Sequence, residues 1–186
     1  MNISQEEKQI LLECARQSIN SNFRNTSFTE PDYEKYPVLQ VPAGAFVTLR
    51  KHHQLRGCVG FIEAQNELFE TIRQAAAYAA FRDSRFLPVE EEEMNDISIE
   101  ISVLSPPEKM NKYEDIEIGK HGLILEDYGR RALLLPQVPI EHHLDRNGFL
   151  SALCEKAGLY KDYWEEKQLN MCLFTATIFS EDELRR

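Results

Sequence analysis

The stretch "DISIEISVLS", residues 96–105, decides the fold, because its apolar and polar side chains alternate almost without a break. Successive residues of a strand point to opposite faces, so one face of this stretch is apolar and the other polar. Such alternation is typical of a strand that buries one side and leaves the other wet or turned toward a cleft. Glu100 lies in the middle of the polar side. The apolar side consists of Ile97, Ile99, Ile101 and Val103.

Hairpins and helices are predicted before and after this strand along the chain. Residues 44–51 and 54–63 read as the two arms of one hairpin, and residues 121–138 read as a second hairpin. A last strand is predicted over residues 171–179. The spacing of apolar residues predicts helices at 5–19, 67–80 and 147–157. Because strands and helices do not alternate regularly, we predict an α+β fold with a largely antiparallel sheet flanked by helices.

Length, charge and hydropathy narrow the class of protein. The 186 residues are enough for a single domain over residues 1–186, or for one domain with a small second lobe. Lys and Arg number 21 against 31 Asp and Glu, and this net charge of −10 makes nucleic acid an unfavourable partner. No apolar stretch approaches the roughly 20 residues that span a bilayer, so we expect no membrane attachment.

The four cysteines are scattered along the chain, and no two of them form a C-x-x-C pair. We therefore expect neither a disulfide framework nor a structural zinc site, and we expect a cytoplasmic location. No glycine-rich phosphate loop or dinucleotide fingerprint is present either, so we expect no cofactor. Three of the cysteines lie on apolar stripes and read as small core residues. Cys58 differs, because Gly57 and Gly60 flank it and would let a substrate or another backbone approach.

Arg56 and Cys58 lie two residues apart, so on a regular strand they project from the same face. A guanidinium beside a thiol lowers the pKa of that thiol and enriches the nucleophilic thiolate. The alternative is structural: Cys58 fills a small space in the core, and Arg56 pairs with an acidic strand residue such as Glu100. The residues themselves leave both interpretations open.

A nucleophilic cysteine needs a base, and five histidines are available. His52 and His53 lie in a predicted turn, and His142 and His143 follow a strand. Neighbouring side chains of an extended chain diverge, so neither pair is a ready metal site. His121 opens a predicted strand and is the histidine that we expect near a cleft, with a structural hydrogen-bonded role as the alternative.

The segment "AAFRDSRFLP" concentrates charge at the end of a predicted helix. Arg82 and Arg85 suit the negative end of the helix dipole, and Asp83 can pair with either of them. These residues form either an electrostatic cap or a two-arginine pocket for a carboxylate or phosphate.

Several segments, taken in order, resemble one known family over nearly the whole chain. They are "GAFVTLRK", "LRGCVG", "AFRDSRF", "ISIEISVLSPPE", "GKHGLIL", "LLLPQVPIE" and "FLSALCEKAGL". This order is similar to that of the AMMECR-one domain family, also called AmmeMemoRadiSam system protein A. The resemblance implies an α+β fold with two unequal lobes and an arginine–glycine–cysteine strand beside a cleft. The family's biochemical activity is not established.

The resemblance also implies candidate site residues and partners. Members of the family are associated with a Memo-like protein and with a radical-SAM enzyme, so we expect partners of these kinds. The motif positions in this chain are Leu55, Arg56, Gly57, Cys58, Gly60, Arg82, Asp83, Arg85, Phe86, Glu100, His121, Gly122, Pro136 and Gln137.

The first functional hypothesis is a cysteine-dependent enzyme or modification factor. Cys58 would be the nucleophile, activated by Arg56, with His121 as the base. Glu100 would orient Arg56, and an arginine of the "RDSR" segment would hold an anionic part of the substrate. The candidate substrate-binding residues are Gly57, Gly60, Arg82, Asp83, Arg85, Glu100 and Gln137.

The second hypothesis is a non-catalytic binding or adaptor module of the same pathway. The same cleft would then take a small molecule or a peptide, and Arg56 would act through hydrogen bonds. RNA binding is a third reading, and it requires Arg56, Arg82 and Arg85 to form a tight cluster on an acidic chain.

Overall fold

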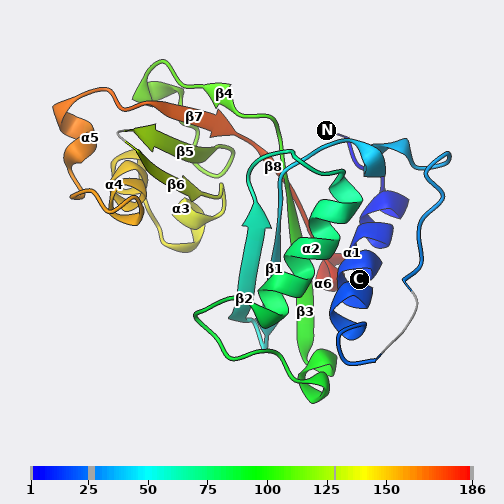
Figure 1. Cartoon of the computed structure of the whole chain (residues 1–186). Coiled ribbons are helices and arrows are strands. Elements are labelled where there is room, and N and C mark those ends of the chain that lie inside the picture. Colours follow the sequence, from blue (N-terminus) through cyan, green and yellow to red (C-terminus); the bar gives the residue numbers. More distant parts are fainter. Residues whose placement is uncertain (1, 25–27, 128, 185–186) are drawn as a thin grey trace. The chain divides into compact units, whose positions relative to one another are not determined.

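The computed structural model describes residues 2–24, 28–127 and 129–184, which form two compact units (Figure 1). The first unit comprises residues 1–104 and 177–186, and the second comprises residues 105–176. Each unit is built on its own four-stranded sheet with helices. The predicted α+β class, the antiparallel pairing and the two unequal lobes are confirmed.

The first unit has its sheet in the order β2-β1-β3-β8. Strand β1 pairs antiparallel with both β2 and β3, so that Val47 lies opposite Val59 on one side and Ile101 on the other. The elements are α1 (Gln5–Asn20), η1 (Pro37–Gln40), β1 (Ala45–Lys51), β2 (Gln54–Phe61), α2 (Leu68–Phe81), η2 (Glu91–Asn95), β3 (Ile97–Leu104), β8 (Ala176–Ser180) and α6 (Glu181–Leu184).

The core of the first unit lies between one face of this sheet and the helices α1 and α2, which pack side by side (Figure 1). The apolar side of the predicted strand 97–103 is buried there. Ala75, Ala76 and Ala79 of α2 are buried in the same core, and their small side chains let the helix come close to the strands.

The β1–β2 hairpin closes with a two-residue turn made of His52 and His53. Their φ angles are 51° and 66°, so both residues are in the left-handed region that a tight hairpin turn of the mirror-image type requires. Glycine and asparagine adopt this region at low cost, whereas other side chains crowd the backbone there. The backbone of His52 and His53 is therefore strained in this turn.

This strain leads to a stability prediction. Replacing His52 with Asn and His53 with Gly is expected to raise the free energy of unfolding by about 1 kcal/mol, because the left-handed turn then costs less. Urea unfolding followed by circular dichroism measures the change. His142, whose φ is −102°, provides the control, and His142→Gly should destabilise rather than stabilise. A destabilised Asn-Gly variant would contradict the prediction.

The second unit has its sheet in the order β4-β7-β5-β6, with antiparallel pairing between the neighbours. Its core packs Phe149, Leu150 and Leu153 of α4 against the strands, among them Leu123 and Leu125 of β5. The elements are β4 (Glu108–Lys109), η3 (Tyr113–Asp115), β5 (Gly122–Asp127), β6 (Arg130–Leu134), α3 (Val138–Glu141), α4 (Arg146–Lys156), α5 (Tyr163–Glu166) and β7 (Met171–Phe174).

One predicted element is wrong. The strand expected over residues 171–179 is two strands, β7 and β8, which belong to different sheets. They separate at Thr175, whose carbonyl accepts from the amide of Ser105 at 2.8 Å and whose amide donates to the hydroxyl of Ser105 at 2.9 Å. Alternation of side chains continues through this break, so the pattern of residues could not reveal it. Among the described residues, no helix has the length and apolar character needed to cross a membrane.

Candidate functional site

Strand β2 carries a bulge at Arg56. Leu49 of β1 pairs with Gly57, but the next residue, Arg50, pairs with Leu55, so Arg56 has no partner of its own in the register. In such a bulge two residues of one strand face one residue of the other. The expectation that Arg56 and Cys58 share a face is therefore wrong, because the alternation restarts after the extra residue.

The contacts on the two sides of β2 agree with this assignment. Gly57 faces α2, since a Cβ atom placed on it would lie 2.2 Å from the carbonyl oxygen of Ala79. Cys58 faces the other side with its partner Thr48, whose hydroxyl donates to Sγ at 3.3 Å. Gly57 therefore faces the core side of the sheet, and Cys58 faces its polar side.

The guanidinium of Arg56 binds a glutamate that the sequence analysis did not single out. Its Nε and Nη2 donate to the carboxylate of Glu93 at 3.0 and 2.8 Å, and only 16% of the Arg56 side chain is exposed. Nη1 donates to the carbonyl of Leu87 at 2.9 Å, and Nη2 to that of Pro88 at 3.3 Å. Arg56 therefore ties the segment before η2 to strand β2.

Glu93 is held by several donors, whereas Glu100 has another partner. Besides Arg56, Lys51 binds Glu93 through Nζ at 3.0 Å. These groups, Arg56 first, lower the pKa of Glu93 to about 2. Glu100 lies 3.9 Å from Arg50, and Arg56 pairs with Glu93 instead. The expectation that Glu100 orients Arg56 is wrong. Glu93 sits in a run of four glutamates, so nothing in the local sequence distinguishes it.

The backbone of Cys58 is held by the "RDSR" segment. Strand β2 is at the edge of its sheet, and the amide of Cys58 donates to Oδ2 of Asp83 at 2.9 Å. Its carbonyl accepts from Nη2 of Arg85 at 3.3 Å. The Asp83–Arg85 pair thus offers one acceptor and one donor, as a neighbouring strand would. It closes the sheet edge at this residue.

The three charged residues of this segment have separate tasks. Arg85 binds Asp83 through Nε at 2.9 Å and Nη2 at 2.7 Å, and it is the main reason that the pKa of Asp83 is lowered to about 2. The guanidinium of Arg82 lies over the ring of Tyr78, 4.7 Å from its centre, and its amide donates to the carbonyl of Tyr78 at the end of α2. The two arginines are directed to different partners.

The flanking glycines accommodate neighbouring parts of the fold. Besides the contact of Gly57 with the helix, a Cβ atom on Gly60 would lie 2.4 Å from the carbonyl oxygen of Ala45 and 2.4 Å from the ring of Phe46. Both distances are shorter than any van der Waals contact. The close approach expected at these glycines is therefore that of the protein's own backbone and side chains.

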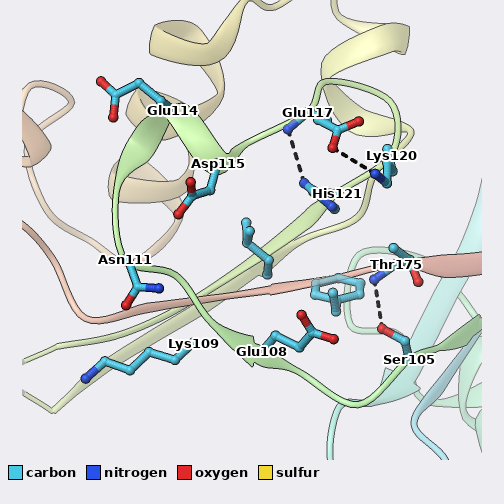
Figure 2. A pocket seen from close by; sticks show the side chains of 12 residues that line it. Ser105, Glu108, Lys109, Asn111, Glu114, Asp115, Glu117, Lys120, His121 and Thr175 are labelled. Carbon is cyan, nitrogen blue, oxygen red and sulfur yellow. Dashed lines mark hydrogen bonds and ion pairs between the residues drawn. The ribbon is translucent and has the colours of Figure 1, made fainter.

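His121 belongs to the second unit, whereas Cys58 belongs to the first. It borders an open hollow of about 680 Å³, shown in Figure 2. Gln137 also belongs to this unit, where its carbonyl accepts from the amides of Ile140 and Glu141 at the start of α3. The hollow is lined by Ser105, Glu108, Lys109, Asn111, Glu114, Asp115, Glu117, Lys120, His121, Leu173, Phe174 and Thr175.

The hydrogen bond of His121 identifies its tautomer. The amide of Glu117 donates to Nδ1 of His121 at 3.1 Å (Figure 2). A nitrogen that accepts a hydrogen bond carries no proton, so the proton of the neutral ring is on Nε2. In this arrangement Nε2 of His121 is an N–H donor, while the lone pair at Nδ1 accepts from the amide of Glu117.

The hollow is polar and its charges are unequal. Four carboxylates and two lysines line it, which leaves a formal charge of −2 when His121 is neutral. One of the lysines, Lys120, is paired with Glu117 at 2.8 Å. Within the described ranges, no group of three or more His, Cys, Asp or Glu side chains is arranged to hold a metal ion.

Comparisons with known proteins confirm the family resemblance of the chain. The model of the AMMECR1 family matches residues 12–179. The chain belongs to the AMMECR1 family. A protein of Thermococcus onnurineus is 42% identical over 190 residues, which cover 97% of this chain and 93% of that protein. A protein of Methanopyrus kandleri is 42% identical over 189 residues, covering 96% and 90%.

A solved structure shows the same fold. The crystal structure of an uncharacterized protein from Pyrococcus horikoshii matches this AMMECR1 chain with a TM-score of 0.89 and 38% sequence identity. The match covers 97% of this chain and 94% of that one. The match therefore includes elements of both units.

The lowered pKa values predict how the stability of this AMMECR1 protein depends on pH. Asp83 and Glu93 have folded-state pKa values of about 2, whereas unfolded carboxyl groups titrate near pH 4. Their contribution is therefore complete above about pH 5 and is lost as the pH falls toward 2. We expect a loss of about 1–2 kcal/mol for each group over this range, because both side chains are largely buried.

Urea unfolding at a series of pH values measures this loss. The variants Asp83→Asn and Glu93→Gln should each show a shallower fall in the free energy of unfolding than the unmodified protein. Glu114→Gln, which changes an exposed carboxylate, is the matched control and should leave the slope unchanged. Equal slopes in all four proteins would rule out the assignment to these two carboxylates.

Proposed function

We propose that this AMMECR1 protein is a non-catalytic binding module, and that the hollow around His121 takes a polar peptide segment with a cationic side chain. The observation that carries the proposal is the hydrogen bond from the amide of Glu117 to Nδ1 of His121. It makes the ring a donor toward a ligand, which is a recognition role. A general base would instead need an available lone pair within reach of the proton that it removes.

The contacts of Arg56 point in the same direction. An arginine that activates a thiolate must leave its positive charge near the sulfur. The guanidinium of Arg56 is directed to Glu93 and to two carbonyl groups, on the opposite side of β2 from the side chain of Cys58. This supports a structural task for the arginine of the motif.

The charge and chemistry of the hollow favour a cationic peptide as the ligand. Its carboxylates outnumber its lysines by four to two, which suits a ligand with a positive charge. Nε2 of His121 can donate to a peptide carbonyl, and carboxylates can accept from peptide amides. A lysine- or arginine-bearing segment supplies the cation, the carbonyls and the amides together.

The resemblance to AmmeMemoRadiSam system protein A extends this proposal to partners. A Memo-like protein and a radical-SAM enzyme are the macromolecules that we propose to carry such a segment. The module would then bring the members of one pathway together and would contribute no catalytic group of its own.

Binding of a defined peptide tests the proposal. In ¹H–¹⁵N correlation spectra, millimolar Ac-Gly-Lys-Gly-NH₂ should shift the amide signals of residues 117–121 and 173–175. Ac-Gly-Glu-Gly-NH₂ should shift them much less, and the double variant Glu108→Gln, Glu114→Gln should weaken the effect of the lysine peptide. Equal responses to both peptides, or no response, would refute the proposed recognition.

A cysteine-dependent enzyme is the second candidate, and one contact favours it. The hydroxyl of Thr48 donates to Sγ of Cys58, and a hydrogen bond to sulfur favours the thiolate. The rate of alkylation by iodoacetamide against pH distinguishes the candidates. For a binding module we expect Cys58 to react no faster at neutral pH than a typical accessible thiol. Fast reaction with an apparent pKa well below about 8.5, lost in Thr48→Val, would favour the enzyme instead.

A further inference from the structure

We infer that His121 is a proton-operated switch, whose protonation releases its ring from the loop 117–121 and so reduces binding in the hollow. The inference deepens the proposed function, because the hollow is the same site. The release of the ring can be observed without any ligand, so the switch itself does not depend on that function.

The loop is closed by a small set of contacts between its two ends. The amide of His121 donates to the carbonyl of Glu117 at 3.0 Å, and the amide of Glu117 donates back to Nδ1 of the ring at 3.1 Å. The amide of Lys120 donates to the same carbonyl at 3.2 Å. Between them, Gly119 turns the chain with a φ of 81°. His121 is thus bound to Glu117 by both backbone and side chain.

The side-chain half of this closure exists only while the ring is neutral. Protonated imidazole has a hydrogen on both nitrogens and cannot accept a hydrogen bond. The amide of Glu117 would then face a second donor, so the contact is lost and the ring must turn away. Histidine is the side chain that most readily changes its protonation state between pH 5 and pH 8.

The charges around His121 act on the released ring as well. Those that line the hollow with it are Glu117 and Lys120 of its own loop, Glu114 and Asp115 of η3, and Glu108 and Lys109 of β4, while β7 contributes uncharged residues. A cationic ring can pair with one of these carboxylates, Glu117 being the nearest along the chain. Lys120 already forms an ion pair with Glu117 at 2.8 Å. Pairing of the cationic ring with Glu117 would therefore rearrange both ends of the loop.

Protonation changes the hollow in two ways that act together. Glu117, Lys120 and His121 form one of its walls, so a ring of His121 that turns away alters its shape (Figure 2). The added positive charge also reduces the formal charge of the lining from −2 to −1. Both effects weaken the binding of a cationic peptide. We expect affinity to fall about fivefold, the factor that one hydrogen bond is worth.

The ligand-free experiment follows the protein by ¹H–¹⁵N correlation spectra from pH 8 to pH 5. We expect the amide of Glu117 and the ring of His121 to titrate with a single shared midpoint, and the Glu117 amide to exchange faster with solvent below it. In His121→Asn the amide oxygen can still accept from Glu117, but it cannot titrate. That variant should keep the Glu117 signal constant, whereas the control His142→Asn should titrate as the unmodified protein does.

A Glu117 amide that does not follow the ring of His121, or that still titrates in His121→Asn, overturns the switch. The second arm measures the affinity of Ac-Gly-Lys-Gly-NH₂ at both ends of the pH range. We expect the fivefold loss in the unmodified protein and none in His121→Asn. If the peptide binds at neither pH while Glu117 and His121 titrate together, the proposed ligand fails and the conformational switch stands.

Discussion

Replacing Gly57 with alanine is expected to lower the free energy of unfolding by about 3 kcal/mol, at the upper end of the range for overpacked cores. The added Cβ would lie 2.2 Å from the carbonyl oxygen of Ala79, which is backbone of α2. A flexible side chain could move aside, but here strand β2 and helix α2 must separate. Gly57 is therefore required by the packing of helix on sheet.

Urea unfolding of Gly57→Ala measures this effect, and Gly129→Asn is the matched control. Among the residues that the structure describes, and apart from its chain neighbours, nothing lies within 4 Å of a Cβ on Gly129, and asparagine tolerates its φ of 74°. The control should change stability by less than about 1 kcal/mol. A Gly57→Ala variant as stable as the control would show that β2 and α2 can separate easily.

Removing either partner of the Arg56–Glu93 pair is expected to cost about 2 kcal/mol of the free energy of unfolding. The two side chains are only 16% and 17% exposed, so each variant leaves the other charge largely buried without its main partner. Arg56→Ala also frees the carbonyls of Leu87 and Pro88, which it binds at 2.9 and 3.3 Å. Arg56→Lys should restore only part of the loss, because an ammonium cannot make this forked set of bonds.

A double-mutant cycle with Arg56→Ala and Glu93→Ala separates the pair from its surroundings. We expect a coupling free energy of about 1–2 kcal/mol, since the residues are in direct contact. The exposed Arg73–Glu70 pair, treated in the same way, should give less than about 0.5 kcal/mol. Additive losses at Arg56 and Glu93 would contradict the structural task that we assign to this arginine.

These two predictions concern residues that the motif makes conspicuous. If Gly57 and Arg56 hold β2 against α2 and η2, their replacement lowers the amount of folded protein before it changes any chemistry at Cys58. Any loss of function in such variants would then reflect the loss of folded protein. The His121 hollow, in the other unit, can be altered without touching this packing, and it is the better place to separate folding from binding.

The amino-acid sequence by itself determined the class of fold and most of its elements. Alternation over residues 97–103 predicted β3, and pairs of strand-like runs with short connections predicted both hairpins, because these signals depend on neighbours along the chain. The predicted helices agree with α1, α2 and α4 to within about two residues at each end. It also placed Asp83 beside Arg85, an ion pair between residues two apart that the structure confirms.

Tertiary structure alone decided which side chains distant along the chain meet. A bulge of one residue moved Arg56 to the opposite side of the strand from Cys58, and a strand-to-strand register is not visible in either strand's own pattern. Glu93 became the partner of Arg56 through a contact 37 positions apart, which no local periodicity encodes. The tautomer of His121 depends on where one backbone amide points. Local patterns predict elements, whereas the groups that recognise a ligand are set by packing between elements distant in the chain.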